Sequence, residues 1–216
     1  MKPFSMFVTL LFTAIFLFSP ADFSFAQSSI DLPAPVTDGG KPLMRVLRER
    51  KSERSFSSRE LPSQVLSDLL WAACGINRPD TQGRTAPSAK NRQEIDVYVA
   101  MSQGLFLYDP LHHRLVLVIA EDIRGLTGTQ DFVAEAPVNL IFVADHLKME
   151  GMTGPQKEFY AATDTGFISE NIYLYCASEG LSTVVRGLIN TLSLGKAMKL
   201  RPSQRIILAQ TVGFPK

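Results

Sequence analysis

The sequence has almost no excess of charge of either sign. Its 22 Lys and Arg residues are nearly balanced by 21 Asp and Glu residues, which leaves a formal net charge of +1. Such a balance lacks the broad basic field that proteins use to bind nucleic acid. It also lacks the acidic tail that would attract a basic partner. We therefore expect no nucleic-acid partner.

Cysteine is scarce. The two cysteines, Cys74 and Cys176, form no CxxC motif and no Cys/His pattern with zinc spacing, so we expect no metal site. Both fall within apolar helical stretches, where a free cysteine behaves as a small buried hydrophobe. We favour two free core cysteines, although an oxidising compartment would also permit a disulfide between them.

Only one long apolar run is present, from Met6 to Phe18, and it is too short to span a bilayer comfortably. Lys2 precedes it, and a polar stretch with Ser24 and Ala26 at signal-peptidase spacing follows. The pattern predicts a cleaved signal peptide over residues 1–26 and export to the periplasm or the medium. An uncleaved N-terminal anchor is the alternative, whereas a lipoprotein anchor is not expected because no cysteine follows the run.

The remaining sequence has the balance of an ordinary globular domain, with 45% hydrophobic and 20% charged residues overall. Residues 27–41 are rich in Pro, Gly and Ser and are predicted to be a linker, followed by one domain over 42–216. Apolar periodicity predicts a mixture of helices and hairpin-forming strands, which is an α+β fold. The expected helices cover 43–49, 62–75, 130–135, 154–179 and 192–200. The expected strands cover 95–101, 104–109, 114–119, 138–145, 182–187 and 205–214. Residues 77–92 are expected to be a loop, and His112 and His113 to be exposed in a turn.

Three segments carry polar groups suited to a ligand. The first holds Arg50, Lys51, Ser52 and Arg54 just after a predicted helix. Guanidinium groups match phosphate oxygens in two-point contacts, and lysine adds a compact charge, so this segment could hold a phosphate-bearing cofactor. Composition alone favours a solvated loop.

The other two segments are a small-residue loop, Pro87–Asn91, and a strand that follows Gly180. Small residues let the backbone approach a flat ligand, and Ser88 and Asn91 offer hydrogen bonds. Backbone N–H groups of the strand could face the polar edge of a ring system. Taken singly, these segments are also compatible with a surface turn and a core strand.

Together the segments resemble the nitroreductase family of flavoproteins over nearly all of residues 43–216. Five motifs occur in the family's order. They are the Arg-x-Ser-x-Arg pattern with a following aromatic at 50–56, the PSAxN-type loop at 87–91, the Ala-Pro element at 135–138, GLxT at 180–183 and VGxP at 212–215. The stretches around WAACGINRP and RTAPSA are similar to the subgroup that includes azoline oxidases.

The resemblance implies a central, mainly antiparallel sheet flanked by helices, in an entwined homodimer that binds FMN at the subunit interface. It also implies ping-pong electron transfer through flavin N5 between a small-molecule donor and acceptor. The protein would orient and tune the flavin, and no catalytic side chain is required.

The resemblance further assigns cofactor-binding residues. Arg50, Lys51, Ser52 and Arg54 would hold the phosphate and ribityl chain, with Arg54 near the N1/O2 edge. The partner subunit would supply the residues that line the ring, which are Pro87, Ser88, Ala89 and Asn91. The strand would supply Val185, with backbone contacts near N5 and O4 from Arg186 and Gly187. Lys216 would be a second phosphate ligand.

Two departures from the family pattern bear on function. Arg92-Gln93-Glu94 stands where the family commonly has Gln-Pro-Trp, and Arg186 precedes Gly187 where Gly or Glu is usual. Export also removes the usual donor, NAD(P)H. The alternatives are therefore a flavin-dependent dehydrogenase or oxidase of an organic, azoline-like substrate, and a non-catalytic flavin-binding protein.

Overall fold

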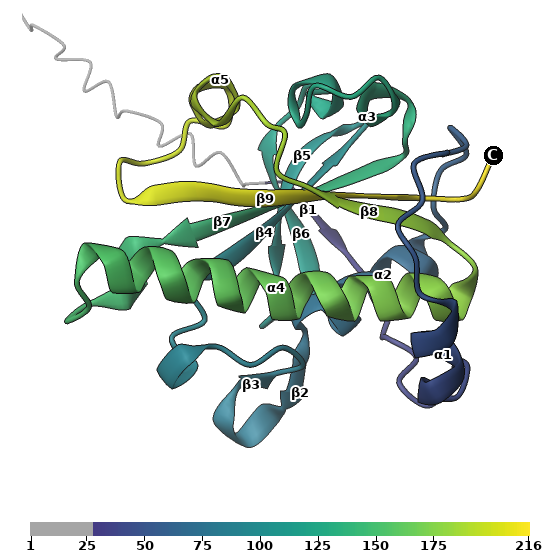
Figure 1. Ribbon diagram of the computed structural model, residues 1–216, viewed down its shortest axis with the longest axis horizontal. Helices are drawn as coiled ribbons and strands as arrows, with labels where there is room; N and C mark the ends of the chain where they lie inside the picture. The colour runs from purple at the N-terminus through teal and green to yellow at the C-terminus, as the bar shows by residue number, and fades with distance from the viewer. Residues whose placement is uncertain (1–27) are drawn as a thin grey trace, which may run out of the picture.

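The structure, a computed structural model, describes residues 28–216; the predicted signal peptide, 1–26, lies outside these residues. Its centre is a seven-stranded sheet in the order β1-β6-β5-β4-β7-β9-β8, in which every neighbouring pair is antiparallel (Figure 1). The strands are β1 (Ser29–Asp31), β4 (Ile95–Met101), β5 (Gly104–Asp109), β6 (Arg114–Ile119), β7 (Val138–Asp145), β8 (Ser182–Arg186) and β9 (Gln204–Gly213). The expected α+β architecture, a mainly antiparallel central sheet flanked by helices, is confirmed.

Helices lie on both sides of the sheet, and the long helix α4 runs across one face beside α2 and α1 (Figure 1). The opposite face carries α3 and α5. The helices are α1 (Leu43–Glu49), α2 (Ser63–Cys74), α3 (Phe132–Glu135), α4 (Gly154–Glu179) and α5 (Thr191–Ala197). The 3₁₀ turns are η1 (Pro79–Thr81), η2 (Ala89–Asn91), η3 (Arg124–Leu126) and η4 (His146–Met149).

The central strand β7 is buried along its whole length, as its uninterrupted apolar run predicts. Alternate side chains enter separate cores, because neighbouring residues of a strand point to opposite faces. Leu140 and Phe142 join the core under α2 and α4, whereas Ile141 and Val143 join the core under α5. The sheet is therefore held between two apolar layers.

Helix α4 begins and ends with strong local signals. Thr153 accepts from the Gln156 N–H, and the Gln156 side chain accepts from the Thr153 N–H, which forms a capping box. Gly180 ends the helix with φ of 70°, a conformation that favours glycine. One side of α4 is buried, but Phe159 and Phe167 on the outer side are 66% and 44% exposed.

Three sequence-based expectations need correction. The predicted linker contains β1, which pairs with β6, so this segment is fastened to the sheet. The predicted loop 77–92 contains all but the first residue of a small hairpin formed by β2 (Ile76–Arg78) and β3 (Gly83–Arg84). His113 is half-buried, with ring nitrogens 2.7 Å from Ser67 Oγ and 2.9 Å from Tyr108 Oη; composition of the turn could not show these long-range partners.

Other expectations hold. Cys74 and Cys176 are both free and buried, as favoured from their apolar surroundings. His112 is exposed.

Within residues 28–216, none of the helices combines the length and apolarity needed to cross a bilayer.

Candidate functional site

The Arg-rich loop after α1 lies along the outer side of β8. The Glu53 N–H donates to the Thr183 carbonyl at 2.9 Å, and the Ser57 N–H donates to the Phe214 carbonyl at 2.8 Å. Phe56 between them is 2% exposed and packs with Val184. These contacts bring the first, fourth and fifth sequence motifs to one edge of the sheet.

Tyr173 of α4 connects the loop to β8. Its hydroxyl lies 2.8 Å from Ser52 Oγ and accepts the Val185 N–H at 2.9 Å. The Arg50 guanidinium lies over the Tyr173 ring, 5.3 Å from its centroid, which is a cation–π distance. Arg50, Ser52 and Val185, all predicted from the sequence to bind a cofactor, therefore meet around a residue that the sequence analysis did not select.

The remaining charges of the loop are more open. The Lys51 ammonium pairs with the Glu53 carboxylate at 2.6 Å, while Arg54 is exposed. A cavity of about 290 Å³ lies beside this pair, between the loop, the end of α4 and the start of β8. At its rim, Lys41 and Arg45 hydrogen-bond to Glu49 and hold the pKa of this carboxyl down to about 2. The edge thus presents several cations together with the hydroxyl groups of Ser52 and Tyr173.

The loop Pro87–Asn91 lies at a different part of α4. The Ala89 N–H donates to Asp164 Oδ2 at 2.8 Å, nine residues before Tyr173 along the helix. At about 100° and 1.5 Å per residue, nine residues place the two side chains on opposite sides of the helix, separated by roughly 13 Å of rise. One chain therefore does not bring this loop to the Arg50–Arg54 segment.

The same loop has an unusual backbone. Lys90, Asn91 and Gln93 have φ of 54°, 52° and 49°. Left-handed conformations are costly for residues other than glycine and persist where surrounding contacts impose them. Ser88 Oγ supplies one such contact, because it accepts the Gln93 N–H at 2.9 Å.

Arg186 on β8 carries a charged side chain that is buried in the sheet. It donates to Thr127 O at 2.8 Å, Thr211 Oγ1 at 2.9 Å and Asn139 Oδ1 at 3.0 Å. All three partners are neutral, and burial lowers the pKa of Arg186 to about 10. The side chain thus joins β8, β9, β7 and the turn after η3, while Gly187 next to it is exposed.

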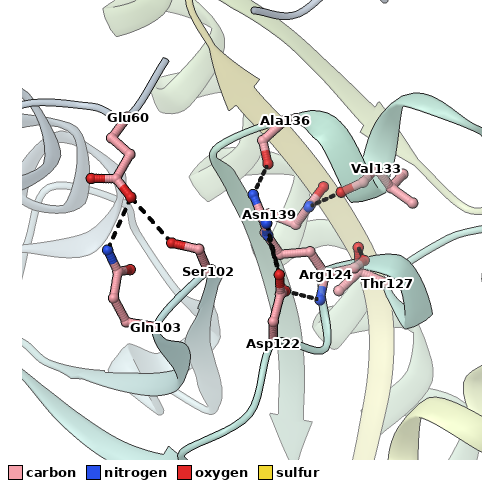
Figure 2. Close-up of polar contacts among 9 residues, drawn as sticks. All are labelled: Glu60, Ser102, Gln103, Asp122, Arg124, Thr127, Val133, Ala136 and Asn139. Atoms are coloured by element: carbon pink, nitrogen blue, oxygen red, sulfur yellow. Dashed lines mark hydrogen bonds and ion pairs between the residues drawn. The ribbon is translucent and has the colours of Figure 1, made fainter. Parts of the chain in front are cut away.

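The Lys216 ammonium pairs with the Glu135 carboxylate at 3.1 Å, and not with a residue of the Arg50–Arg54 segment. Both line a cavity of about 480 Å³ near the start of β7. Figure 2 shows its polar walls, with Glu60 accepting from Ser102 and Gln103 on one side. On the other side, Asp122 pairs with Arg124, whose guanidinium also donates to Ala136 O (Figure 2).

The buried amide of Asn139 follows the cavity-lining Val138 on β7. Asn139 donates to Val133 O at 2.7 Å, and its oxygen receives Arg186 and Thr211. Within residues 28–216, no group of three His, Cys, Asp or Glu side chains is arranged to hold a metal ion.

Comparison with known proteins decides the family. Residues 47–214 match the model of the Nitroreductase family. The chain belongs to this family. It is 29% identical over 167 residues to MJ1384 of Methanocaldococcus jannaschii, named as a candidate nitroreductase, with 72% of this chain and 83% of the relative covered.

Two solved structures are similar to this chain. A candidate nitroreductase from Ralstonia eutropha JMP134 is 48% identical, with a TM-score of 0.84 over 87% of this chain and 90% of the other. The Escherichia coli microcin synthetase McbBCD complex has a chain that is 17% identical, with a TM-score of 0.70 over 98% of this chain and 85% of the other. At that identity, the second likeness concerns the fold alone. Because the nitroreductase family implies oxidoreductase activity, this protein is an oxidoreductase.

Two residues of the site escaped the sequence analysis. Tyr173 has no local motif, and only its position on the helix face toward β8 reveals its role. Glu94 is fully buried beside the Pro87–Asn91 loop. The sequence signal for Glu94 is that Arg92-Gln93-Glu94 stands where the family commonly has Gln-Pro-Trp.

Proposed function

We propose that this nitroreductase-family protein is an FMN-dependent oxidoreductase that works as a homodimer. The residues at the edge of β8 have the chemistry that FMN requires. Arg50 and Arg54 supply guanidinium groups for phosphate, and Ser52 supplies a hydroxyl for the phosphate or ribityl oxygens. The chemistry supplied by bound FMN is ping-pong electron transfer through N5.

The strand β8 orients the ring edge in this proposal. Val185 is held by Tyr173, so the backbone that follows it, at Arg186 and Gly187, has a fixed starting point. The buried Arg186 side chain anchors the same stretch to three other segments. Such preorganised backbone donors stabilise charge that develops on a bound ring.

The division of the site between two parts of α4 supports a dimer. The Pro87–Asn91 loop lies on the opposite side of the helix from Tyr173, so a second chain must bring its own loop to the β8 edge. The outer face of α4 offers a surface for that contact, because Phe159 and Phe167 are exposed there. Lys216 as a phosphate ligand belongs to the same proposal and requires its ammonium to leave Glu135.

The observation that carries the proposal is the meeting of Ser52, Arg50 and Val185 around Tyr173. The test is an absorbance spectrum of the protein, incubated with FMN and desalted. About one oxidised flavin per chain is expected. A colourless product would favour the alternative of a family fold without a cofactor.

Variants locate the phosphate site. Arg50→Ala with Arg54→Ala is expected to weaken FMN binding at least about a hundredfold, since each charged hydrogen bond contributes roughly 1.5–3 kcal/mol. Arg48→Ala is the matched control, because Arg48 is an exposed cation on α1 just before the loop. Unchanged affinity in the double variant would place the phosphate elsewhere.

The electron donor separates two versions of the function. A predicted signal peptide, if it directs export, takes the protein away from cytosolic NAD(P)H. This expectation, together with the resemblance of the WAACGINRP and RTAPSA stretches to azoline oxidases, favours a second candidate that oxidises an organic substrate. Anaerobic bleaching of the flavin by NAD(P)H supports the first version, and bleaching only by an azoline-like substrate supports the second.

A further inference from the structure

Glu94 is a buried acid without a donor. Its side chain is 0% exposed, and neither carboxyl oxygen receives a hydrogen bond when it is written as a carboxylate. A charged carboxylate in such surroundings is strongly disfavoured, because it has lost water and gained no partner. The group needs a proton or a donor.

The neighbouring acid provides the explanation. Asp164 on α4 is 2% exposed, and its carboxyl lies near that of Glu94 and raises the pKa of that group. Asp164 Oδ2 accepts the Ala89 N–H at 2.8 Å, whereas neither carboxyl oxygen of Glu94 has such a donor. The proton is therefore placed on Glu94, where it can be shared with Asp164.

We propose that Glu94 and Asp164 share one proton and that this shared proton positions the loop of residues 88–93. The inference rests on the proposed function for its role, because this loop would line the flavin of the partner subunit. Glu94 and Asp164 are thus positioning residues, which act on the bound ring only through the loop.

The surrounding charges are consistent with one proton between the two acids. Lys148 of η4 faces Glu94 at longer range, but its ammonium is engaged by Asp96 at 2.6 Å. Arg84 and Cys74 line the small cavity that also contains Asp164 and Ser88. Burial and the nearby Asp164 raise the pKa of Glu94 to about 7.

Loss of the proton acts on the loop because the loop carries the left-handed residues Lys90, Asn91 and Gln93, while the two acids are held in place. Glu94 is fixed through its carbonyl, which accepts the Asp145 N–H at 3.0 Å, and Asp164 is fixed within a 26-residue helix. Two buried carboxylates repel each other and attract water. Movement of the left-handed loop residues lets water reach the pair and releases their backbone strain.

The experiment measures amide hydrogen exchange at Ala89 in the full chain without flavin, corrected for the intrinsic effect of pH. Between pH 6 and 8.5, protection is expected to fall at least about tenfold in the wild type. In Glu94→Gln the permanent donor should keep protection constant. Asp164→Asn should do the same, because its oxygen can accept from Ala89 while its amide donates to Glu94.

Glu121→Gln makes the same chemical change at an exposed position and should keep the wild-type pH dependence. Flat protection in the wild type overturns the inference, as does a fall in Glu94→Gln equal to that of the wild type.

The FMN dissociation constant, measured at the same two pH values, gives the second readout. A pH-dependent loop in a protein that binds no flavin would leave the shared proton standing and remove the proposed function. If the protein binds flavin but protection of the loop does not depend on pH, the proposed function stands and the shared proton is ruled out.

Discussion

The hydroxyl groups of Ser52 and Tyr173 lie 2.8 Å apart although 121 residues separate them in the chain. Tyr173 also receives the Val185 N–H, so one phenol links the Arg-rich loop, the long helix and the edge strand. The two motifs that resemble flavin-binding segments are thereby held by a single side chain. The pairing gives a direct test of whether their geometry matters.

Tyr173→Phe removes the hydroxyl and keeps the ring beneath Arg50. The lost hydroxyl holds both Ser52 and Val185, and each hydrogen bond contributes about 0.5–1.5 kcal/mol. FMN affinity should therefore fall roughly three- to tenfold, and the free energy of unfolding should fall by about 1–3 kcal/mol. Fluorescence titration of FMN measures the effect. Tyr160→Phe, on the first half of the same helix, should leave affinity unchanged; an equal loss in both variants would contradict a specific role for Tyr173.

Gly128 should tolerate no side chain. An added Cβ there would collide with the Arg186 guanidinium and come within 2.8 Å of Gln130 Oε1. Gly128→Ala should therefore lower the free energy of unfolding by about 1–3 kcal/mol, because a buried hydrogen-bonded group must move. Urea unfolding measures the change. Gly125→Ala, where the nearest atom to the new Cβ is 3.8 Å away, serves as the control and should cost less.

Phe167→Glu should separate the subunits. Phe167 is 44% exposed on the outer face of α4, and a charge there would be buried in the proposed interface. Light scattering should show a dimer in the wild type and a monomer in the variant, with loss of bound FMN. Leu192→Glu, at an 86% exposed position on the opposite side of the sheet, should remain a dimer. A wild-type monomer would remove the dimer proposal altogether.

Glu94 should make stability depend on pH. Its pKa is raised from 4.5 to about 7 in the folded protein, so folding takes up a proton between these values. The unfolded chain binds fewer protons there, and stability falls as pH rises from about 4.5 to 7 before levelling off. Glu94→Gln should remove this slope and gain about 2–3 kcal/mol relative to the wild type at pH 8. Urea unfolding at pH 5, 6, 7 and 8 tests the sign; a wild type that gains stability over this range through Glu94 would contradict it.

Much of the fold follows from local sequence signals. The apolar run of β7 and the alternation around β4, β5 and β6 predict strands with the observed limits, because side-chain periodicity reports the two faces of a strand. Gly180 and the polar start of α4 similarly mark the ends of that helix.

Features made by distant contacts were harder to predict. The strand β1 has three exposed residues in a segment rich in Pro, Gly and Ser, and only its pairing with β6 makes it a strand. His113 and Tyr173 likewise acquire their partners through tertiary packing. The sequence motifs indicated where a cofactor would bind, but they did not show that Arg186 turns its side chain into the sheet.

The two outer strands of the sheet also determine how the protein resists sticking to other copies of itself. Exposed strand edges invite pairing with further chains, and natural sheets counter this with very short edge strands or a covering loop. Here β1 is three residues long at one side, and the Arg-rich loop covers β8 at the other through Glu53 and Thr183. A chain shortened to begin at Leu32 would uncover β6 along Arg114–Val116, and the edge so exposed would be a starting point for aggregation.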